Sequence, residues 1–175
     1  NTRGDYWVID RETWAMHKLG GTAQPSTLMF AKFAPTDRRV AYVREHNLYI
    51  EEFPGGQVQQ LTSDGSDTLI NGTFDWVYEE ELGLRDGYRW SPDGRFIAYW
   101  QLDSSEVRSF TLINNTDSLY PELIQIPYPK AGERNSSGRV GVINAEGGET
   151  QWLDVPGDPS NHYIARMDWA YSSEN

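Results

Sequence analysis

The sequence predicts an all-β fold, a partial β-propeller of about three to four blades of four-stranded antiparallel sheets with one short inserted helix. Short apolar runs alternate with clusters of Gly, Pro, Asp and Asn, and helical periodicity is nearly absent. The run from Phe96 to Trp100 is apolar at every position, so it needs cover on both faces, which stacked blades supply. A β-sandwich, which also has short, evenly spaced strands, is the alternative.

A weak internal repeat supports the propeller. The segment Phe33–Tyr42 parallels Trp90–Tyr99 at an offset of 57 residues, longer than the ~40–50 residues of common propeller repeats. An insertion between the two units accounts for the excess. At about 45 residues per blade, a chain of 175 residues is too short for a closed ring.

The first unit is expected to hold four strands in chain order. They are predicted at residues 28–33, 40–43, 47–53 and 57–62. The last three of these strands are separated by the polar residues Glu45-His46-Asn47 and by the turn Pro54-Gly55-Gly56, which indicates hairpin connections.

One short helix is predicted from Trp76 to Leu82, inside the insertion. Asp75 is a suitable N-cap, and Gly83 or Gly87 ends the helix. We expect the apolar side chains of the helix to anchor it to the sheet, namely Trp76, Val77 and Leu82.

The second unit begins with a strand at residues 88–90. Ser91-Pro92-Asp93-Gly94 is a strong type I turn signal and leads into a strand at 95–101. A further hairpin is expected between residues 140–144 and 150–155, around Glu146-Gly147-Gly148-Glu149. We expect Met167–Ala170 to open another unit.

Composition excludes several kinds of function. With 26 acidic against 15 basic residues the net charge is −11, which argues against binding nucleic acid. Cysteine is absent, so disulfides, thiolate metal sites and a cysteine nucleophile are excluded. No apolar run approaches the ~18 residues of a membrane segment. No cofactor or metal site is predicted, because Asp64-Gly65-Ser66-Asp67 lacks EF-hand spacing.

Three adjacent glutamates, Glu79, Glu80 and Glu81, allow two interpretations. Such a run is commonly a solvated helix face. It could also receive an ammonium group, which has three donors and no acceptor and is therefore satisfied by two converging carboxylates. The residues alone leave both interpretations open.

The segment around these glutamates resembles the propeller of the dipeptidyl peptidase IV family, in the prolyl oligopeptidase clan of serine peptidases. The resemblance covers nearly the whole chain and is closest to bacterial members. Its most specific part is Asp75-Trp76-Val77-Tyr78-Glu79-Glu80-Glu81, followed by Trp90-Ser91-Pro92-Asp93-Gly94. Further matching segments are Asn1–Val8, Pro25–Phe30, Ile126–Gly132 and His162–Ile164 leading to Trp169.

The resemblance implies that residues 1–175 are part of an eight-bladed propeller that caps an α/β-hydrolase domain. The implied activity is release of N-terminal dipeptides with Pro or Ala second, from peptides with a free N-terminus. Matched residue by residue, Glu80 and Glu81 would bind the α-amine of the substrate, and Glu79 would support them. The resemblance also implies that the protein is located in the bacterial periplasm or the extracellular space.

No catalytic residue is predicted in this chain. It has no Gly-x-Ser-x-Gly nucleophile elbow, and the family's catalytic Ser, Asp and His lie in the hydrolase domain, which is absent here. We therefore expect His17, His46 and His162 to be structural and the chain alone to be inactive. The missing hydrolase domain is an expected partner, and open blade edges predict self-association.

The sequence is also compatible with two other functions. One is a non-enzymatic propeller that binds peptides or protein partners. The other is a propeller glycosidase, which adjacent glutamates suit poorly because its two carboxylates must flank the bond about 5–9.5 Å apart. A Gly-x-Ser-x-Gly motif further along the parent protein would separate the peptidase from the binding module.

Overall fold

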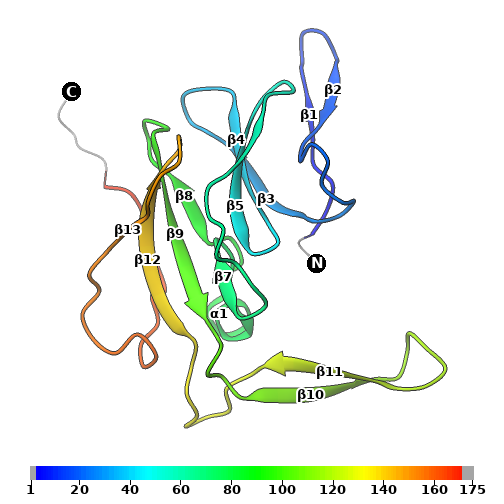
Figure 1. Ribbon diagram of the computed structural model, residues 1–175, viewed down its shortest axis with the longest axis vertical. Coiled ribbons are helices and arrows are strands. Elements are labelled where there is room, and N and C mark those ends of the chain that lie inside the picture. The colour runs from blue at the N-terminus through cyan, green and yellow to red at the C-terminus, as the bar shows by residue number, and fades with distance from the viewer. Residues whose placement is uncertain (1–2, 171–175) are drawn as a thin grey trace.

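The computed structural model describes residues 3–170, most of whose regular structure is antiparallel sheet (Figure 1). The first large sheet, blade 1, contains β3 (Leu28–Phe33), β4 (Arg39–Arg44), β5 (Asn47–Glu52) and β6 (Val58–Gln60) in that order. The four strands expected in the first unit are confirmed. Glu45 and His46 form the turn between β4 and β5 with φ values of 49° and 59°, as tight two-residue hairpins require.

The second large sheet, blade 2, has an interrupted inner strand. Its strands are β7 (Leu69–Asn71), β8 (Tyr88–Trp90), β9 (Phe96–Asp103), β12 (Ser137–Asn144) and β13 (Gln151–Trp152). β12 pairs along the whole of one side of β9, whereas β7 and β8 pair with successive parts of its other side. Blade 2 therefore has four strand positions, like blade 1.

Hydrogen bonds confirm the repeat of 57 residues. The amide of Ala34 donates to the carbonyl of Arg39 over 2.8 Å. At the corresponding place in blade 2, the amide of Ser91 donates to the carbonyl of Phe96 over 2.8 Å. The sequence repeat thus marks the same turn between the first two strand positions of each blade.

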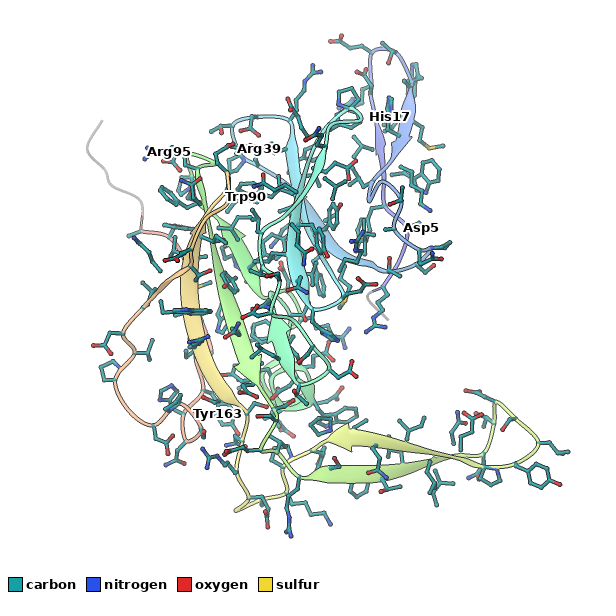
Figure 2. All side chains as sticks on the ribbon, in the orientation of Figure 1. Asp5, His17, Arg39, Trp90, Arg95 and Tyr163 are labelled. Atoms are coloured by element: carbon teal, nitrogen blue, oxygen red, sulfur yellow. The ribbon has the colours of Figure 1, made fainter. Side chains whose placement is uncertain are left out.

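Each of the two repeated turns also contains an ion pair between an Asp and the Arg two residues later. Asp37 accepts from Arg39 in blade 1 and Asp93 accepts from Arg95 in blade 2, each over 2.6 Å. The Arg39 guanidinium lies 5.7 Å from the centre of the Trp90 ring, which connects the two blades. Figure 2 shows Arg39, Trp90 and Arg95 gathered at one end of the blades.

Both faces of β9 are covered, as its apolar sequence predicts. Ile97 and Tyr99 belong to a cluster between the two blades. Trp100 and Leu102 belong to a second cluster on the opposite face. The inter-blade cluster is completed by Ala41, Val43, Leu48, Ile50, Leu61, Tyr88, Ile143 and Ala145.

Two hairpins complete the structure, and neither is predicted from the sequence. β1 (Trp7–Ile9) and β2 (Met16–Lys18) lie beside blade 1, where Val8 contacts its outer cluster. β10 (Ser109–Asn114) and β11 (Glu122–Pro127) form an arm that projects from the end of blade 2 (Figure 1). The partial propeller with one short helix is confirmed. Within residues 3–170 it has two blade-sized sheets and these two hairpins, so the described residues form fewer four-stranded blades than the three to four expected.

Met167–Ala170 forms neither strand nor helix, and the unit that it is expected to open lies outside the described residues. The indole N–H of Trp169 donates to the carbonyl of Arg89 over 3.2 Å, which holds the segment against blade 2. From residue 3 to residue 170 no helix is long and apolar enough to cross a bilayer.

Candidate functional site

The helix that carries the glutamate run, α1 (Trp76–Leu82), lies within an insertion in the inner strand of blade 2. Both ends of the insertion bond to one residue of β9: the amide of Gly72 donates to the Trp100 carbonyl over 2.9 Å, and the Trp100 amide donates to the Gly87 carbonyl over 3.0 Å. A Cβ on Gly87 would stand 2.7 Å from the Gly72 carbonyl carbon. Glycine therefore lets the chain leave and re-enter the sheet at one point.

Side chains fix both ends of α1 as predicted. A carboxylate oxygen of Asp75 accepts from the Tyr78 amide over 3.0 Å, which caps the N-terminus. Gly83 ends the helix in the left-handed conformation, with φ of 66°, and its amide donates to the Tyr78 carbonyl. A helix of seven residues needs such ends, because short helices are marginal in isolation.

The glutamates differ in their surroundings. Glu79 is half-buried and lies 4.0 Å from the guanidinium of Arg85. Glu80 and Glu81 are exposed in the last turn, and neither forms an ion pair with another residue in the described range 3–170. The two predicted site residues thus present adjacent unpaired carboxylates to solvent.

The helix is attached to blade 2 by Phe74 and Tyr78. Tyr78 is 1% exposed, and burial raises the pKa of its hydroxyl. Phe74 stacks on it with ring centres 5.2 Å apart. The expectation that Trp76 and Leu82 anchor the helix is wrong, because they are 43% and 38% exposed. Trp76 and Tyr78 are two residues apart in the helix and therefore point in nearly opposite directions, so burial of Tyr78 turns Trp76 outward.

The chain segment after β13 contacts the helix through Tyr78. The Tyr78 hydroxyl accepts from the Ile164 amide over 3.0 Å. The indole N–H of Trp100 donates to the Ile164 carbonyl over 2.9 Å. Tyr163, near the arm end of blade 2 in Figure 2, contacts the Tyr78 ring edge-to-face at 5.5 Å. None of these contacts has a local sequence signal, because Tyr78 and Ile164 are 86 residues apart.

The outward face of α1 meets the base of the arm. Trp76 and Tyr128 contact each other with ring centres 6.0 Å apart, and Tyr128 also contacts Phe110 at 5.7 Å. A recess of about 460 Å³ lies between helix and arm, lined by Trp76, Phe110, Leu112, Ile126, Tyr128, Lys130 and Ala131.

The histidines are not brought together. His17 lies in β2, His46 in the β4–β5 turn and His162 in the segment after β13. Burial lowers the pKa of His46. In the described part of the chain, no three His, Asp or Glu side chains are grouped so that they could hold a metal ion.

Comparison with known families gives one match over the whole length. The sequence model described as "Dipeptidyl peptidase IV (DPP IV) N-terminal region" matches residues 1–175. Among curated proteins, mouse "Prolyl endopeptidase FAP" is 37% identical over 141 residues, 79% of this chain. "Dipeptidyl aminopeptidase B" of Saccharomyces cerevisiae is 33% identical over 153 residues, 85% of this chain.

Solved structures show the same similarity. The fold matches Porphyromonas gingivalis dipeptidyl peptidase 4 with a TM-score of 0.82 and 33% identity, over 90% of this chain and 22% of that one. This chain covers 18% of the mouse relative and 18% of the yeast relative. It therefore spans about a fifth of the length of its relatives.

Proposed function

The chain belongs to the dipeptidyl peptidase IV family, whose N-terminal region it matches over its full length, and from this we propose that it recognises the substrate of a serine exopeptidase that releases N-terminal dipeptides. The yeast relative is named a dipeptidyl aminopeptidase and the P. gingivalis relative a dipeptidyl peptidase, which supports a peptidase parent. The proposed substrates are peptides with a free N-terminus and Pro or Ala second.

The observation that carries the proposal is the pair of exposed, unpaired carboxylates of Glu80 and Glu81 on a helix fixed at both ends. A primary ammonium has three N–H donors and no acceptor. Charge-assisted hydrogen bonds from it to two carboxylates are among the stronger polar contacts in proteins. Entry of the ammonium also relieves the mutual repulsion of the two anions.

An anchored amine would explain why a dipeptide is released. Two extended residues span at most about 7 Å, so the amine site and the nucleophile lie a fixed distance apart in such an enzyme. Binding energy at the amine then positions the scissile bond, which is a proximity effect. The propeller would gate access in addition, and the hydrolase domain would supply the Ser, Asp and His.

The division of labour between the two domains is testable. We expect the isolated chain to show no turnover of a Gly-Pro chromogenic amide, because it contains no Gly-x-Ser-x-Gly elbow. Turnover that survives repurification and is blocked by a serine-directed inhibitor would contradict this.

The location of the parent in the periplasm or outside the cell stays a prediction, which cell fractionation tests.

The amine site is tested in the full-length protein with Glu80→Gln and Glu81→Gln. Each substitution keeps the shape of the side chain and removes its charge. We expect kcat/KM for free-amine Gly-Pro amides to fall by about ten- to a hundredfold, as for loss of a charged hydrogen bond worth ~1.5–3 kcal/mol. N-acetylated Gly-Pro amides should be poor substrates of every form. The matched control is Glu122→Gln, an exposed glutamate on the arm. Variants that keep the wild-type preference for the free amine would establish the run as a solvated helix face.

A further inference from the structure

We propose that Tyr78 is a positioning residue for Glu80 and Glu81, because its hydroxyl fixes α1 to the segment that follows β13. This inference rests on the proposed amine site. The observation behind it is that both backbone groups of Ile164 are bound by side chains: its amide donates to the Tyr78 hydroxyl over 3.0 Å, and its carbonyl accepts from the Trp100 indole over 2.9 Å.

The segment that contains Ile164 is not held in place by regular secondary structure. Residues 162–170 form neither strand nor helix. Ile164 therefore obtains from Tyr78 and Trp100 the hydrogen bonds that a neighbouring strand would otherwise supply, and buried backbone groups need such partners. Ile164 and Met167 also pack on the cluster that contains Tyr78 and Trp100. The contact is thus both polar and apolar.

The same contact restrains the helix. Tyr78 is 1% exposed and is the third of the seven residues of α1. Its amide binds the Asp75 cap, its carbonyl accepts from the amides of Gly83 and Leu84, and its hydroxyl binds Ile164. All three polar groups of this residue are engaged, so a shift of its side chain would be transmitted to both ends of the helix.

Glu80 and Glu81 follow Tyr78 by two and three residues. On a helix of fixed geometry, the direction of their carboxylates depends on how the Tyr78 side chain is seated. An ammonium site of two carboxylates requires their convergence, and small displacements weaken such a site. Tyr78 would act through the glutamates without touching the substrate.

The test is Tyr78→Phe in the full-length protein, with Tyr163→Phe as the matched control. Both substitutions delete one phenolic hydroxyl at the same helix. Tyr163 is 44% exposed, and its hydroxyl has no hydrogen bond to any residue between 3 and 170. Steady-state kinetics on a free-amine Gly-Pro amide are combined with two other readouts. These are the rate of inactivation by a small serine-directed reagent without an amine, and hydrogen exchange of the amides of residues 79–84.

We expect Tyr78→Phe to raise KM by about three- to tenfold with little change in kcat, the size of effect that follows from loss of a single hydrogen bond. Exchange at residues 79–84 should become faster, and inactivation by the amine-free reagent should keep its wild-type rate. Tyr163→Phe should match the wild type in all three measurements. A general loss of folding would slow inactivation as well, so the unchanged rate separates positioning from a merely structural role.

Two results would overturn the inference, and they are distinguishable. If Glu80→Gln and Glu81→Gln raise KM but Tyr78→Phe does not, the amine site stands and the positioning role of Tyr78 is contradicted. If none of the three variants changes KM, the amine site itself fails and this inference fails with it. Should Tyr78→Phe not accumulate as folded enzyme, Trp100→Phe removes the donor to the Ile164 carbonyl and is judged by the same readouts.

Discussion

Asp75 determines where α1 begins. Its carboxylate accepts from the Tyr78 amide, which would otherwise have no partner within the helix. We predict that Asp75→Ala lowers the free energy of unfolding of the chain by ~0.5–2 kcal/mol, the usual range for loss of an N-cap. Urea unfolding of the isolated chain measures the change. Asp75→Asn keeps a capping oxygen and should stay close to the wild type. Equal destabilisation by both variants would show that the cap contributes nothing specific.

Tyr88 connects the two blades through its hydroxyl, which donates to the carbonyls of Phe30 and Ala41. Burial raises its pKa well above the ordinary 10.0. A raised folded-state pKa means that the stabilisation is fully present below pH 10.0 and is lost as the pH rises above it. Alkaline solution should therefore weaken the junction between the blades.

The prediction for Tyr88→Phe follows from this sign. Near pH 8 the variant should be less stable than the wild type by ~1–3 kcal/mol, because the carbonyls of Phe30 and Ala41 lose the donor that they share. Near pH 11 the difference should shrink, because only the wild type can lose the Tyr88 proton. Urea unfolding at both pH values measures it, with the exposed Tyr120→Phe as control. A difference that stays constant with pH would contradict the account.

At the scale of elements, the arm is an addition to blade 2. It connects β9 to β12, whereas in blade 1 the corresponding strands β4 and β5 are joined by Glu45 and His46 alone. β10 and β11 pair only with each other among the described strands, from Ser109 opposite Pro127 to Asn114 opposite Glu122. The sheet of blade 2 therefore does not depend on the arm for its hydrogen bonds.

We predict that the arm can be replaced without unfolding blade 2. Asp103 and Ser137 are paired at the ends of β9 and β12, so the residues between them can be exchanged for an Asn-Gly turn. The shortened chain should keep cooperative thermal unfolding and the β-sheet circular dichroism of the wild type. An Asn-Gly insertion into the loop at the tip of the arm serves as control. Loss of cooperative unfolding would mean that the contact between Trp76 and Tyr128 supports the blade.

Elements with a local signal were predictable from the sequence, and elements made by distant contacts were not. The turn at residues 91–94 and the caps Asp75 and Gly83 fix their neighbours through short-range hydrogen bonds, so β8, β9 and α1 were predicted nearly to their ends. β7 was not predicted, because a strand of only three residues is too short to show a strand pattern by itself. Hairpin β10–β11 exposes apolar side chains such as Ile113 and Leu123, so it lacks the alternation of a half-buried strand.

The candidate site shows the same division. Glu80 and Glu81 are predicted as site residues through a resemblance carried by adjacent residues, and the helix that carries them is predicted from its caps. The side chains that anchor the helix to the sheet were predicted wrongly. Burial of Tyr78 in place of Trp76 depends on Ile164, which arrives from the far end of the chain. Side-chain size favoured Trp76, and only the fold reveals which face of the helix meets the sheet.

At the scale of the whole molecule, two blades form a stack whose outer faces are only partly covered. The β1–β2 hairpin covers blade 1, yet its own large side chains are exposed: Trp7 54%, Ile9 49%, Trp14 73% and Met16 61%. Such surfaces on repeat units are normally covered by neighbouring units. This exposure agrees with the proposal that the chain is part of a larger propeller.

We predict that the isolated chain self-associates through these faces. Light scattering after size exclusion should give a mass above 20.0 kDa that falls on dilution. Replacing Trp14 and Met16 by Lys should shift the chain toward the monomer, because a buried charge without a partner is costly. Lys at the exposed positions Gln125 and Thr111 of the arm provides a control. A monodisperse monomer whose mass stays at 20.0 kDa at every concentration would contradict the prediction.

A crystal structure of the full-length protein with the dipeptide Gly-Pro bound would show whether Glu80 and Glu81 bind the N-terminal amine of the substrate. We expect the terminal nitrogen to lie about 2.7–3.2 Å from a carboxylate oxygen of each glutamate. A dipeptide whose amine is held by other groups, with water alone facing Glu80 and Glu81, would contradict it.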